Sequence, residues 1–319
     1  MRKVVVGADI GGTNTPFSLI DRDGNSLIDT FNISTRDHKF AETFVDEMAI
    51  KIKEALKLVG DAELVGIGIG APNGNYYNGT IEFAPNLQWK GVIPLVDLFK
   101  SHFDIPVVLT NDANAAAIGE MIFGGAKELR DFIVITLGTG LGSGIVANGE
   151  LIYGFDGFAG ELGHVIVSPG GRMCGCGRRG CLETYVSATG IKRTVYKLLA
   201  DLLDDSQLRN VSFNELSAEM ISIAASGGDT IALKAFEYTG EVLGKALADF
   251  AAFSTPKTIF LFGGLAKAGD FIFEPTKKHF EENLLKIYKN KIQILPSELQ
   301  NKNAAILGAA ALIWKQIDE

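Results

Sequence analysis

Cysteine is scarce in this sequence: only three cysteines occur among 319 residues. An odd number of cysteines cannot pair entirely within one chain, which excludes the densely disulfide-linked scaffold of small secreted proteins. The N-terminal segment is apolar for only a few residues before it reaches an acid and paired glycines, which is not the pattern of a secretory signal peptide. We therefore expect a cytoplasmic protein with reduced thiols.

An excess of basic residues is also missing. The chain has 30 Lys and Arg against 38 Asp and Glu, a formal net charge of −8, whereas nucleic-acid binding normally uses a basic face. No apolar run reaches the length of about 18 residues expected of a membrane-spanning helix. Neither nucleic acid nor membrane is therefore expected as a partner. With 47% hydrophobic and 21% charged residues, the composition is that of an ordinary enzyme of about two domains.

The few cysteines lie close together. Cys174, Cys176 and Cys181 fall within eight residues, and His164 precedes them by ten. Three thiolates and one imidazole complete a tetrahedral zinc shell, and a closed shell leaves no position for a catalytic water. The intervening glycines allow the backbone to turn the sulfurs toward one point. The sequence therefore predicts a structural zinc site; the alternative is a cluster of free thiols beside an unrelated histidine.

Two similar units of strands and glycine turns indicate an internal duplication. A β-branched strand at 4–9 ends in Gly11-Gly12-Thr13-Asn14, and a strand at 132–137 runs into Gly138-Thr139-Gly140 roughly 125 residues later. A third glycine pair, Gly263-Gly264, follows a strand at 258–262. Backbone amides in such turns can surround phosphate oxygens. The turns are not Walker A loops, because no Gly-Lys-Ser/Thr follows the two glycine clusters.

Apolar periodicity and turn residues predict the other elements. A second strand is expected at 17–20, after Pro16, because proline cannot donate to a strand ladder, and a third at 26–28. Alternating glycines in a strand at 64–71 indicate close approach of another backbone or a ligand. Further strands are expected at 106–110, 145–147, 151–152 and 293–295, and helices at 42–59, 190–203, 213–225, 229–254, from about 270, and at 303–315. The pattern predicts an α/β fold.

Five motifs appear in the order found in one family. They are Asp9-Ile-Gly-Gly-Thr13, Asn111-Asp112-Ala-Asn114, Leu137-Gly-Thr-Gly-Leu-Gly142, Gly160-Glu-Leu-Gly-His164 and the cysteine segment that ends at Glu183. From about residue 3 to the C-terminus, the chain resembles the ROK family (repressor, open reading frame, kinase) of sugar kinases. The resemblance implies the actin-like ATPase (ribonuclease-H-like) fold, with two lobes around a central cleft, and a homodimer.

The resemblance also implies how the chain divides. The expected small N-terminal lobe comprises residues 1–115 plus about 300–319. The large lobe comprises residues 116–299, with the zinc loop and the helices on the nucleotide side. No linker or low-complexity stretch separates the halves, so a tight hinge beside the cleft is expected.

A sugar kinase needs a base for the sugar hydroxyl and electrostatic support for the phosphates. Asp112 is the candidate base, because it follows a strand at the start of a helix, where a carboxylate is favoured; the alternative is that it only caps that helix. By resemblance, the sugar would be bound by Asn86, Asn111, Asp112, Glu161, His164 and Glu183. His164 would bind zinc through one ring nitrogen and face the sugar with the other.

The resemblance also assigns the nucleotide side. Asp9 would lie on the Mg²⁺ side, acting through water. ATP phosphates would bind the two turns formed by Gly11, Gly12, Thr13 and Asn14 and by Gly138, Thr139 and Gly140, with Gly263 and Gly264 at the adenosine. Asn73 departs from the family pattern, since relatives often have glycine at this position. ATP, Mg²⁺ and a structural Zn²⁺ are thus the expected cofactors.

The expected reaction is phosphorylation of a hexose by ATP, with glucose the first candidate, since Ala84-Pro-Asn-Leu-Gln-Trp89 resembles the glucokinase branch. Alternative acceptors are N-acetylglucosamine, N-acetylmannosamine or another hexose, and polyphosphate is an alternative donor. A sugar-responsive transcriptional regulator is a remote alternative. Such relatives carry an N-terminal helix-turn-helix segment, whereas the phosphate-side strand is expected here from Val4.

Overall fold

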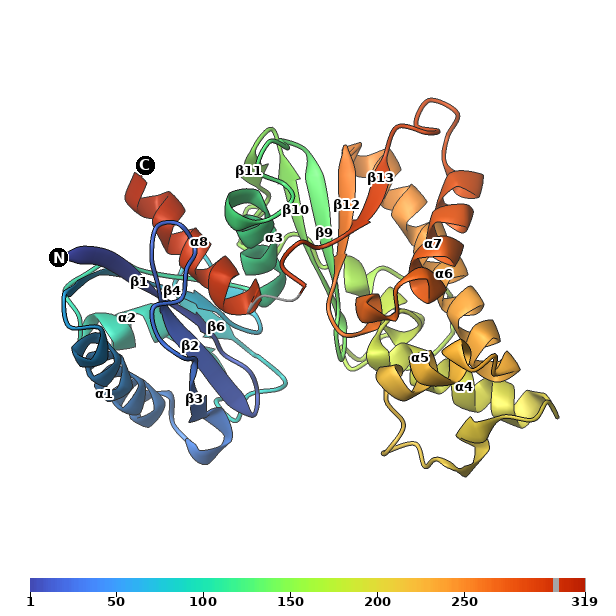
Figure 1. Ribbon diagram of the computed structural model, residues 1–319, viewed down its shortest axis with the longest axis horizontal. Coiled ribbons are helices and arrows are strands. Elements are labelled where there is room, and N and C mark those ends of the chain that lie inside the picture. The colour runs from blue at the N-terminus through green and yellow to red at the C-terminus, as the bar shows by residue number, and fades with distance from the viewer. Residues whose placement is uncertain (301–303, 319) are drawn as a thin grey trace.

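The computed structural model describes residues 1–300 and 304–318 and has two lobes side by side (Figure 1). The strands of the N-terminal lobe are β1 (Arg2–Asp9), β2 (Asn14–Ile20), β3 (Phe31–Ser34), β4 (Ala62–Gly70) and β8 (Val107–Thr110). Those of the C-terminal lobe are β9 (Phe132–Leu137), β10 (Leu141–Ala147), β11 (Glu150–Leu151), β12 (Thr258–Phe262) and β13 (Gln293–Pro296). The sheet orders are β3-β2-β1-β4-β8 and β11-β10-β9-β12-β13.

The two sheets repeat one topology. In each, the first three strands form an antiparallel meander, and the last two add in parallel beside the first strand. Parallel addition requires a crossover connection, which helices provide. The internal duplication predicted from the glycine turns and the two-lobed α/β fold implied by the family resemblance are therefore confirmed.

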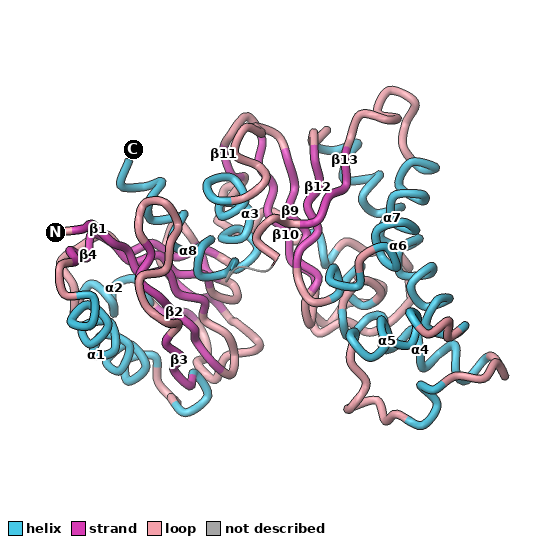
Figure 2. Tube along the Cα trace, viewed as in Figure 1, coloured by secondary structure: helices cyan, strands magenta, loops and turns pink. Residues whose placement is uncertain are grey.

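Helices cover both sheets (Figure 2). They are α1 (Ala41–Val59), α2 (Leu95–Lys100), α3 (Asp112–Phe123), α4 (Ala188–Asp201), α5 (Ala218–Ser226), α6 (Thr230–Ser254), α7 (Asp270–Asn283) and α8 (Ala304–Asp318). A small sheet of β5 (Gly74–Asn75), β6 (Thr80–Glu82) and β7 (Val92–Ile93) extends the N-terminal lobe. Among the described helices, none combines the length and apolarity needed to cross a membrane.

The first hairpin differs from the sequence prediction. β2 begins at Asn14 and includes Pro16. The last pair between β1 and β2 is Ala8 with Phe17, and Pro16 lies one residue beyond it. A missing backbone donor is therefore tolerated there. The third strand is Phe31–Ser34, not 26–28, because Ser18 and Ser26 direct their hydroxyls to the carbonyl of Ile28 and the segment makes only one bridge.

The helices follow the sequence prediction with one clear exception. α1 ends before Gly60, in agreement with the helix predicted at 42–59, and the Asp229 carboxylate caps α6 by accepting from the Ala232 amide at 3.0 Å. The helix expected at 213–225 begins only at Ala218, because Ser217 provides the N-cap and accepts from the Met220 amide at 3.1 Å. Of the last helix, the predicted first residue, Asn303, lies outside the described residues.

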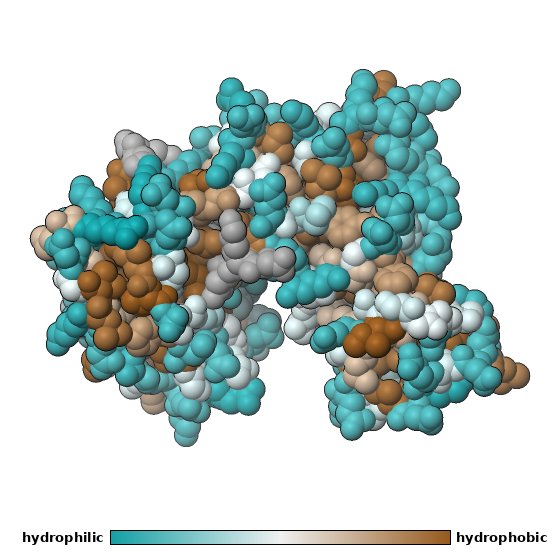
Figure 3. All heavy atoms as spheres, in the orientation of Figure 1, coloured by the Kyte–Doolittle hydropathy of each residue, from teal (hydrophilic) through white to brown (hydrophobic). Residues whose placement is uncertain are grey.

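Helices α3 and α8 connect the lobes. α8 lies on β1 and β4, and its backbone approaches β4 so closely that a Cβ on Gly68 would be 1.8 Å from the Ala309 carbonyl oxygen. α3 lies on β9 and β10 and contacts α8, where a Cβ on Gly308 would be 2.3 Å from the Ala115 carbonyl oxygen. The alternating glycines of β4 thus accommodate another backbone, as the sequence predicted. At the lower edge of the view, a deep indentation separates the two lobes (Figure 3).

Candidate active site

A cleft of about 620 Å³ receives residues from both lobes. The N-terminal lobe contributes Asn73, Phe83 and Asn86, and the C-terminal lobe contributes Thr139, Gly140, His164, Cys174, Cys176 and Glu183. All of these except Asn73 and Phe83 were predicted for the sugar, the phosphates or the metal. The cleft therefore joins one glycine turn to the zinc loop and to the segment around Asn86.

Asp112 is the first residue of α3, directly after β8. The residue before it, Asn111, is the N-cap, and its Oδ1 accepts from the Asn114 amide at 2.7 Å. Asp112 Oδ1 accepts from its neighbour's amide, Ala113, at 2.8 Å. Desolvation by the surrounding protein raises the pKa of the Asp112 carboxyl, although backbone amides oppose the rise. Asn111 therefore caps α3, and Asp112 is a solvent-accessible carboxylate whose proton affinity is increased.

A second acidic residue lies beside Asp112. Asp9 ends β1, and burial, followed by repulsion from Asp112, raises its pKa from 3.8 to about 7. Gly70 lies between them: a Cβ there would be 3.8 Å from Asp9 Oδ1 and 3.7 Å from Asp112 Cα. Two neighbouring carboxylates with weak solvation form a donor set that suits a hard divalent cation such as Mg²⁺.

The three cysteines and His164 converge as predicted. Their four ligand atoms all lie within 4.8 Å of one another. Cys174 Sγ is 3.6 Å from His164 Nδ1, and Cys176 Sγ is 3.7 Å from Cys181 Sγ. Tetrahedral zinc with bonds of about 2.0–2.3 Å places nitrogen and sulfur ligands about 3.5–3.8 Å apart. The residues present therefore fit a zinc ion, with Nδ1 as the imidazole ligand atom.

Beside the metal cluster, three polar side chains face one another. His164 Nε2 is 3.9 Å from Glu161 Oε2, and Glu183 Oε1 is 3.8 Å from His164 Nδ1 and 3.0 Å from Cys174 Sγ. Burial raises the pKa of Glu161; His164 lowers it, and the carboxylates of Asp112 and Glu183 raise it further. These mutual effects mean that residues far apart in sequence share one electrostatic environment.

Each of the two predicted phosphate turns lies beside a residue of the candidate site. Gly11 donates to the Asn14 carbonyl at 3.1 Å, and Gly138 donates to the Gly140 carbonyl at 3.0 Å. A Cβ on Gly12 would lie 2.3 Å from the Asn86 carbonyl oxygen, and one on Gly140 would lie 2.7 Å from Glu183 Oε2. The turns therefore lie directly against two residues predicted to contact the sugar.

The third glycine pair lies against the second turn. A Cβ on Gly263 would be 2.8 Å from the carbonyl oxygen of Leu137, the residue before Gly138. The Gln300 side chain accepts from the Gly263 amide at 3.1 Å and donates to its carbonyl at 2.8 Å. At Gly264, a Cβ would meet no atom within 4 Å. The backbone at Gly264 is thus the more open part of the pair.

Sequence reasoning missed several residues of this region. Arg36 donates to Thr13 Oγ1 at 3.1 Å, which places a guanidinium at the first glycine turn. Arg193, on α4, lines the cleft and donates to the Met173 carbonyl at 3.0 Å. Neither arginine belongs to a sequence motif, and only the fold brings their side chains to the site. Only the folded chain could identify these two cations.

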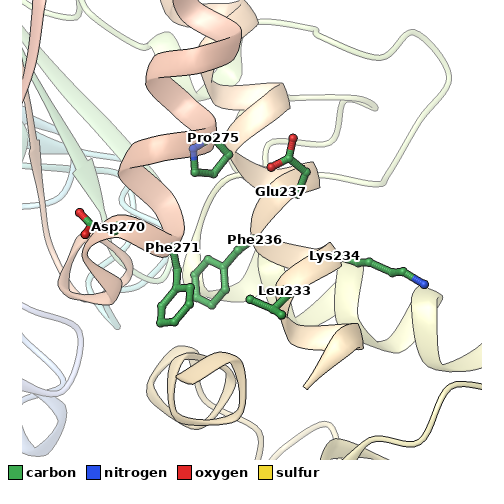
Figure 4. A pocket seen from close by; sticks show the side chains of 7 residues that line it. All are labelled: Leu233, Lys234, Phe236, Glu237, Asp270, Phe271 and Pro275. Atoms are coloured by element: carbon green, nitrogen blue, oxygen red, sulfur yellow. The ribbon is translucent and has the colours of Figure 1, made fainter. Parts of the chain in front are cut away.

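A second depression lies between α6 and α7, away from these residues (Figure 4). It has a volume of about 390 Å³ and an apolar floor that includes Phe236, Phe271 and Pro275. Glu237 at its rim is paired with Lys278 at 3.1 Å and His279 at 3.0 Å. The lining contains none of the residues predicted for sugar, phosphate or metal, so the candidate active site is the cleft between the lobes.

Comparison with known proteins agrees with this geometry. The chain is 35% identical to a glucokinase of Halalkalibacterium halodurans, over 98% of this chain and 95% of the relative. It is 34% identical to a ROK family glucokinase of Streptomyces griseus solved in complex with glucose and AMPPNP, with a TM-score of 0.80 over 97% of this chain and 98% of that one. It is also 28% identical to a xylose repressor of Caldicellulosiruptor bescii, over 97% of this chain and 77% of the relative.

The similarity to glucokinases over nearly the whole of both chains identifies the protein as a sugar kinase with the actin-like ATPase fold. The model of the ROK family matches residues 5–316, a range that includes every residue of the candidate site. The chain therefore belongs to the ROK family.

Proposed function

We propose that this sugar kinase transfers the γ-phosphoryl group of ATP to a hexose, most readily to glucose, and forms glucose 6-phosphate. The observation that carries the proposal is the convergence of separate segments: Glu161 and Glu183 both lie beside His164, at 3.9 and 3.8 Å. Asp112 and Glu183 both raise the pKa of the Glu161 carboxyl. Similarity to the glucokinases of H. halodurans and S. griseus supports glucose as the acceptor and ATP as the donor.

Asp112 would act as the general base. Its carboxyl has a raised pKa, and a base with increased proton affinity accepts the hydroxyl proton more readily as the phosphoryl group arrives. Asp9 would hold Mg²⁺ through water, and the ion would neutralise phosphate charge when bound. The Gly11–Asn14 and Gly138–Gly140 turns would orient the phosphates through backbone amides, with Gly263 and Gly264 beside the adenosine.

Sugar recognition would depend on carboxylates and amides that differ in hydrogen-bonding character. Glu161 and Glu183 can each accept from sugar hydroxyls, and His164 Nε2 faces the side where Glu161 lies. The Asn111 acceptor already caps α3, so its amide nitrogen remains to donate to the sugar. Asn86 would contact the sugar from the N-terminal lobe. Mixed donors and acceptors on both sides discriminate one hexose stereoisomer from another.

Zinc would act as an organiser of this site and take no part in phosphoryl transfer. His164, Cys174, Cys176 and Cys181 would hold the ion, and their spacing supports a tetrahedral shell. The metal would fix His164 and the adjoining Glu183 relative to Glu161. We further propose a homodimer, and a division into residues 1–115 plus about 300–319 and residues 116–299.

A coupled assay tests the activity. Purified protein would be given ATP and Mg²⁺ with glucose, mannose, fructose, N-acetylglucosamine or N-acetylmannosamine, and kcat/KM compared. Glucose is expected to give the highest value. A higher kcat/KM with an N-acetylated sugar would show that this sugar, and not glucose, is the preferred acceptor. Polyphosphate supplied in place of ATP tests the phosphoryl donor. No phosphorylation of any sugar would refute the kinase assignment and leave the sugar-responsive regulator.

A further inference from the structure

The segment that carries Glu161 is attached to the opposite lobe. It follows β11 and runs over residues 152–160 in the C-terminal lobe, yet it contacts the hairpin of β5 and β6 in the N-terminal lobe. The Asn75 side chain donates to the Asp156 carbonyl oxygen at 2.9 Å, and the Tyr77 hydroxyl donates to the Gly154 carbonyl oxygen at 3.0 Å. Two hydrogen bonds therefore cross between the lobes at this point.

Asn75 is the centre of the contact. It is only 1% exposed, and its Oδ1 accepts from the backbone amides of Tyr77 at 3.0 Å and Asn78 at 3.2 Å. Its Nδ2 donates to Glu82 Oε1 at 3.0 Å as well as to Asp156. A buried amide with all these bonds made is held in one orientation, since any rotation would leave polar atoms without partners.

Aromatic packing adds to the contact. Tyr76 stacks on Tyr153, with ring centroids 4.2 Å apart and an interplanar angle of 10°. The opposing loop is shaped to fit: Gly157 has a φ of 91°, and a Cβ there would lie 2.6 Å from Asn75 Oδ1. Only glycine combines this backbone conformation with such a close approach at little cost.

The other end of the segment is fixed to its own lobe. The Ser143 hydroxyl on β10 donates to the Gly160 carbonyl oxygen and accepts from the Leu162 amide at 3.3 Å. Glu161 thus lies between an attachment to the N-terminal lobe at 154–157 and an attachment to the C-terminal lobe at Ser143. Its position depends on both.

We propose that Asn75 is a positioning residue for sugar binding, which holds the Glu161 segment against the lobe that carries Asp112. This inference rests on the proposed function of Glu161 and Asp112 in a sugar kinase. Asn75 does not line the cleft, and it acts through the loop. Its loss is expected to weaken the sugar complex while the glycine turns keep their geometry, so the KM for sugar changes and the KM for ATP does not.

The test compares Asn75→Ala with Phe155→Ala. Phe155 belongs to the same loop but is 96% exposed, so its removal should change nothing. In Asn75→Ala, we expect faster amide hydrogen exchange over residues 152–162 and a two- to tenfold rise in the KM for glucose, the scale of one or two lost hydrogen bonds. The KM for ATP should stay within twofold. Should Asn75→Ala fail to fold, Tyr77→Phe removes one crossing bond and should shift both readouts in the same direction.

Three results would overturn the proposal: unchanged exchange in the loop, faster exchange with an unchanged KM for glucose, or equal changes in the KM for glucose and ATP. The wild-type protein separates this proposal from the proposed function. If the wild type phosphorylates glucose and Asn75→Ala has the same KM for glucose and the same exchange as the wild type, only the role of Asn75 fails. If it phosphorylates no sugar, the proposed function fails, and the exchange data still report whether Asn75 holds the loop.

Discussion

At the scale of single residues, the proposed chemistry depends on the neighbouring carboxylates. Asp112→Asn keeps the size of the side chain and the acceptor for the Ala113 amide but cannot take a proton. We expect sugar affinity to change little and kcat to fall at least roughly a hundredfold, the usual effect of losing a general base. Asp97→Asn is a matched control, because Asp97 is exposed in the first turn of α2. Near-normal turnover in Asp112→Asn would remove this residue from the mechanism.

Asp9 makes a prediction about pH. Its pKa is about 7 in the folded chain against a usual 3.8, so between these values the folded state binds more protons than the unfolded state. The free energy of unfolding contributed by Asp9 therefore falls as pH rises through this window. The side chain introduced by Asp9→Asn does not titrate, so the variant does not lose this part of the free energy of unfolding. Measured without Mg²⁺, the Tm of Asp9→Asn minus that of the wild type should increase from pH 4 to pH 7. A difference that is constant with pH would contradict the raised pKa.

The residues of the site could be predicted only in part from sequence. Motifs identified Asp112, Glu161, His164 and the cysteines, because thiols, an imidazole and acids at such spacings beside glycine turns are typical of metal and ligand sites. They did not reveal that Asn111 is the helix cap. The positioning role of Asn75 could not be predicted either, since a lone asparagine in a hairpin is typical of a turn residue. Its buried hydrogen bonds form only when two distant segments meet.

At the scale of elements, the proposed zinc loop is expected to affect sugar specificity as well as stability. Cys176→Ser removes one ligand of the four-atom cluster and should loosen Glu183 and His164 while leaving the Gly138 turn intact. Each lost charge-assisted hydrogen bond costs about 1.5–3 kcal/mol, so the KM for sugar should rise at least roughly tenfold. The KM for ATP should change little. Elemental analysis of the wild type should give close to one zinc per chain.

The control for this variant is Arg179→Ala, an exposed change in the same loop outside the ligand set. If zinc only stabilises the fold, Cys176→Ser lowers the active fraction and leaves both KM values unchanged. Equal rises for sugar and ATP would likewise remove the specificity role. A wild-type protein that is metal-free and fully active would show that the loop is organised without zinc.

Element boundaries were predictable where a local signal decided them. Gly60 ends α1 and Asp229 begins α6, because capping acts within one helical turn. The third strand was misplaced, since its pairing with β2 at Phe31–Ser34 is a tertiary contact, and the apolar residues at 26–28 carry the same pattern. The start of α5 was misjudged because apolar periodicity extends upstream of the Ser217 cap.

At the scale of the whole molecule, a buried acid adds to the two helices and to the loop contact at Asn75 that join the lobes. Glu120 on α3 is 1% exposed. Its carboxylate accepts from the Gly125 amide at 2.9 Å, the Ser297 hydroxyl and the Leu299 amide at 3.4 Å. It therefore ties the end of α3 to the segment that leads toward α8. We therefore expect any rotation of the lobes relative to each other to occur about this region. The division of the chain near 115 and 300 remains a prediction, and α3 runs continuously across the first of these positions.

A hinge of this kind leads to the last prediction, that sugar closes the cleft. Asn86 and Asp112 belong to segments next to the N-terminal sheet, whereas Glu161 and Glu183 belong to the C-terminal lobe. One small sugar that contacts all of them would draw the lobes together, and closure would also remove water that could otherwise accept the phosphoryl group. Solution scattering should give a smaller radius of gyration with saturating glucose than without it. Galactose, or another sugar that the assay shows is not phosphorylated, is the control and should leave the curve unchanged. An identical curve with and without glucose would contradict closure and favour a cleft already set in its binding geometry.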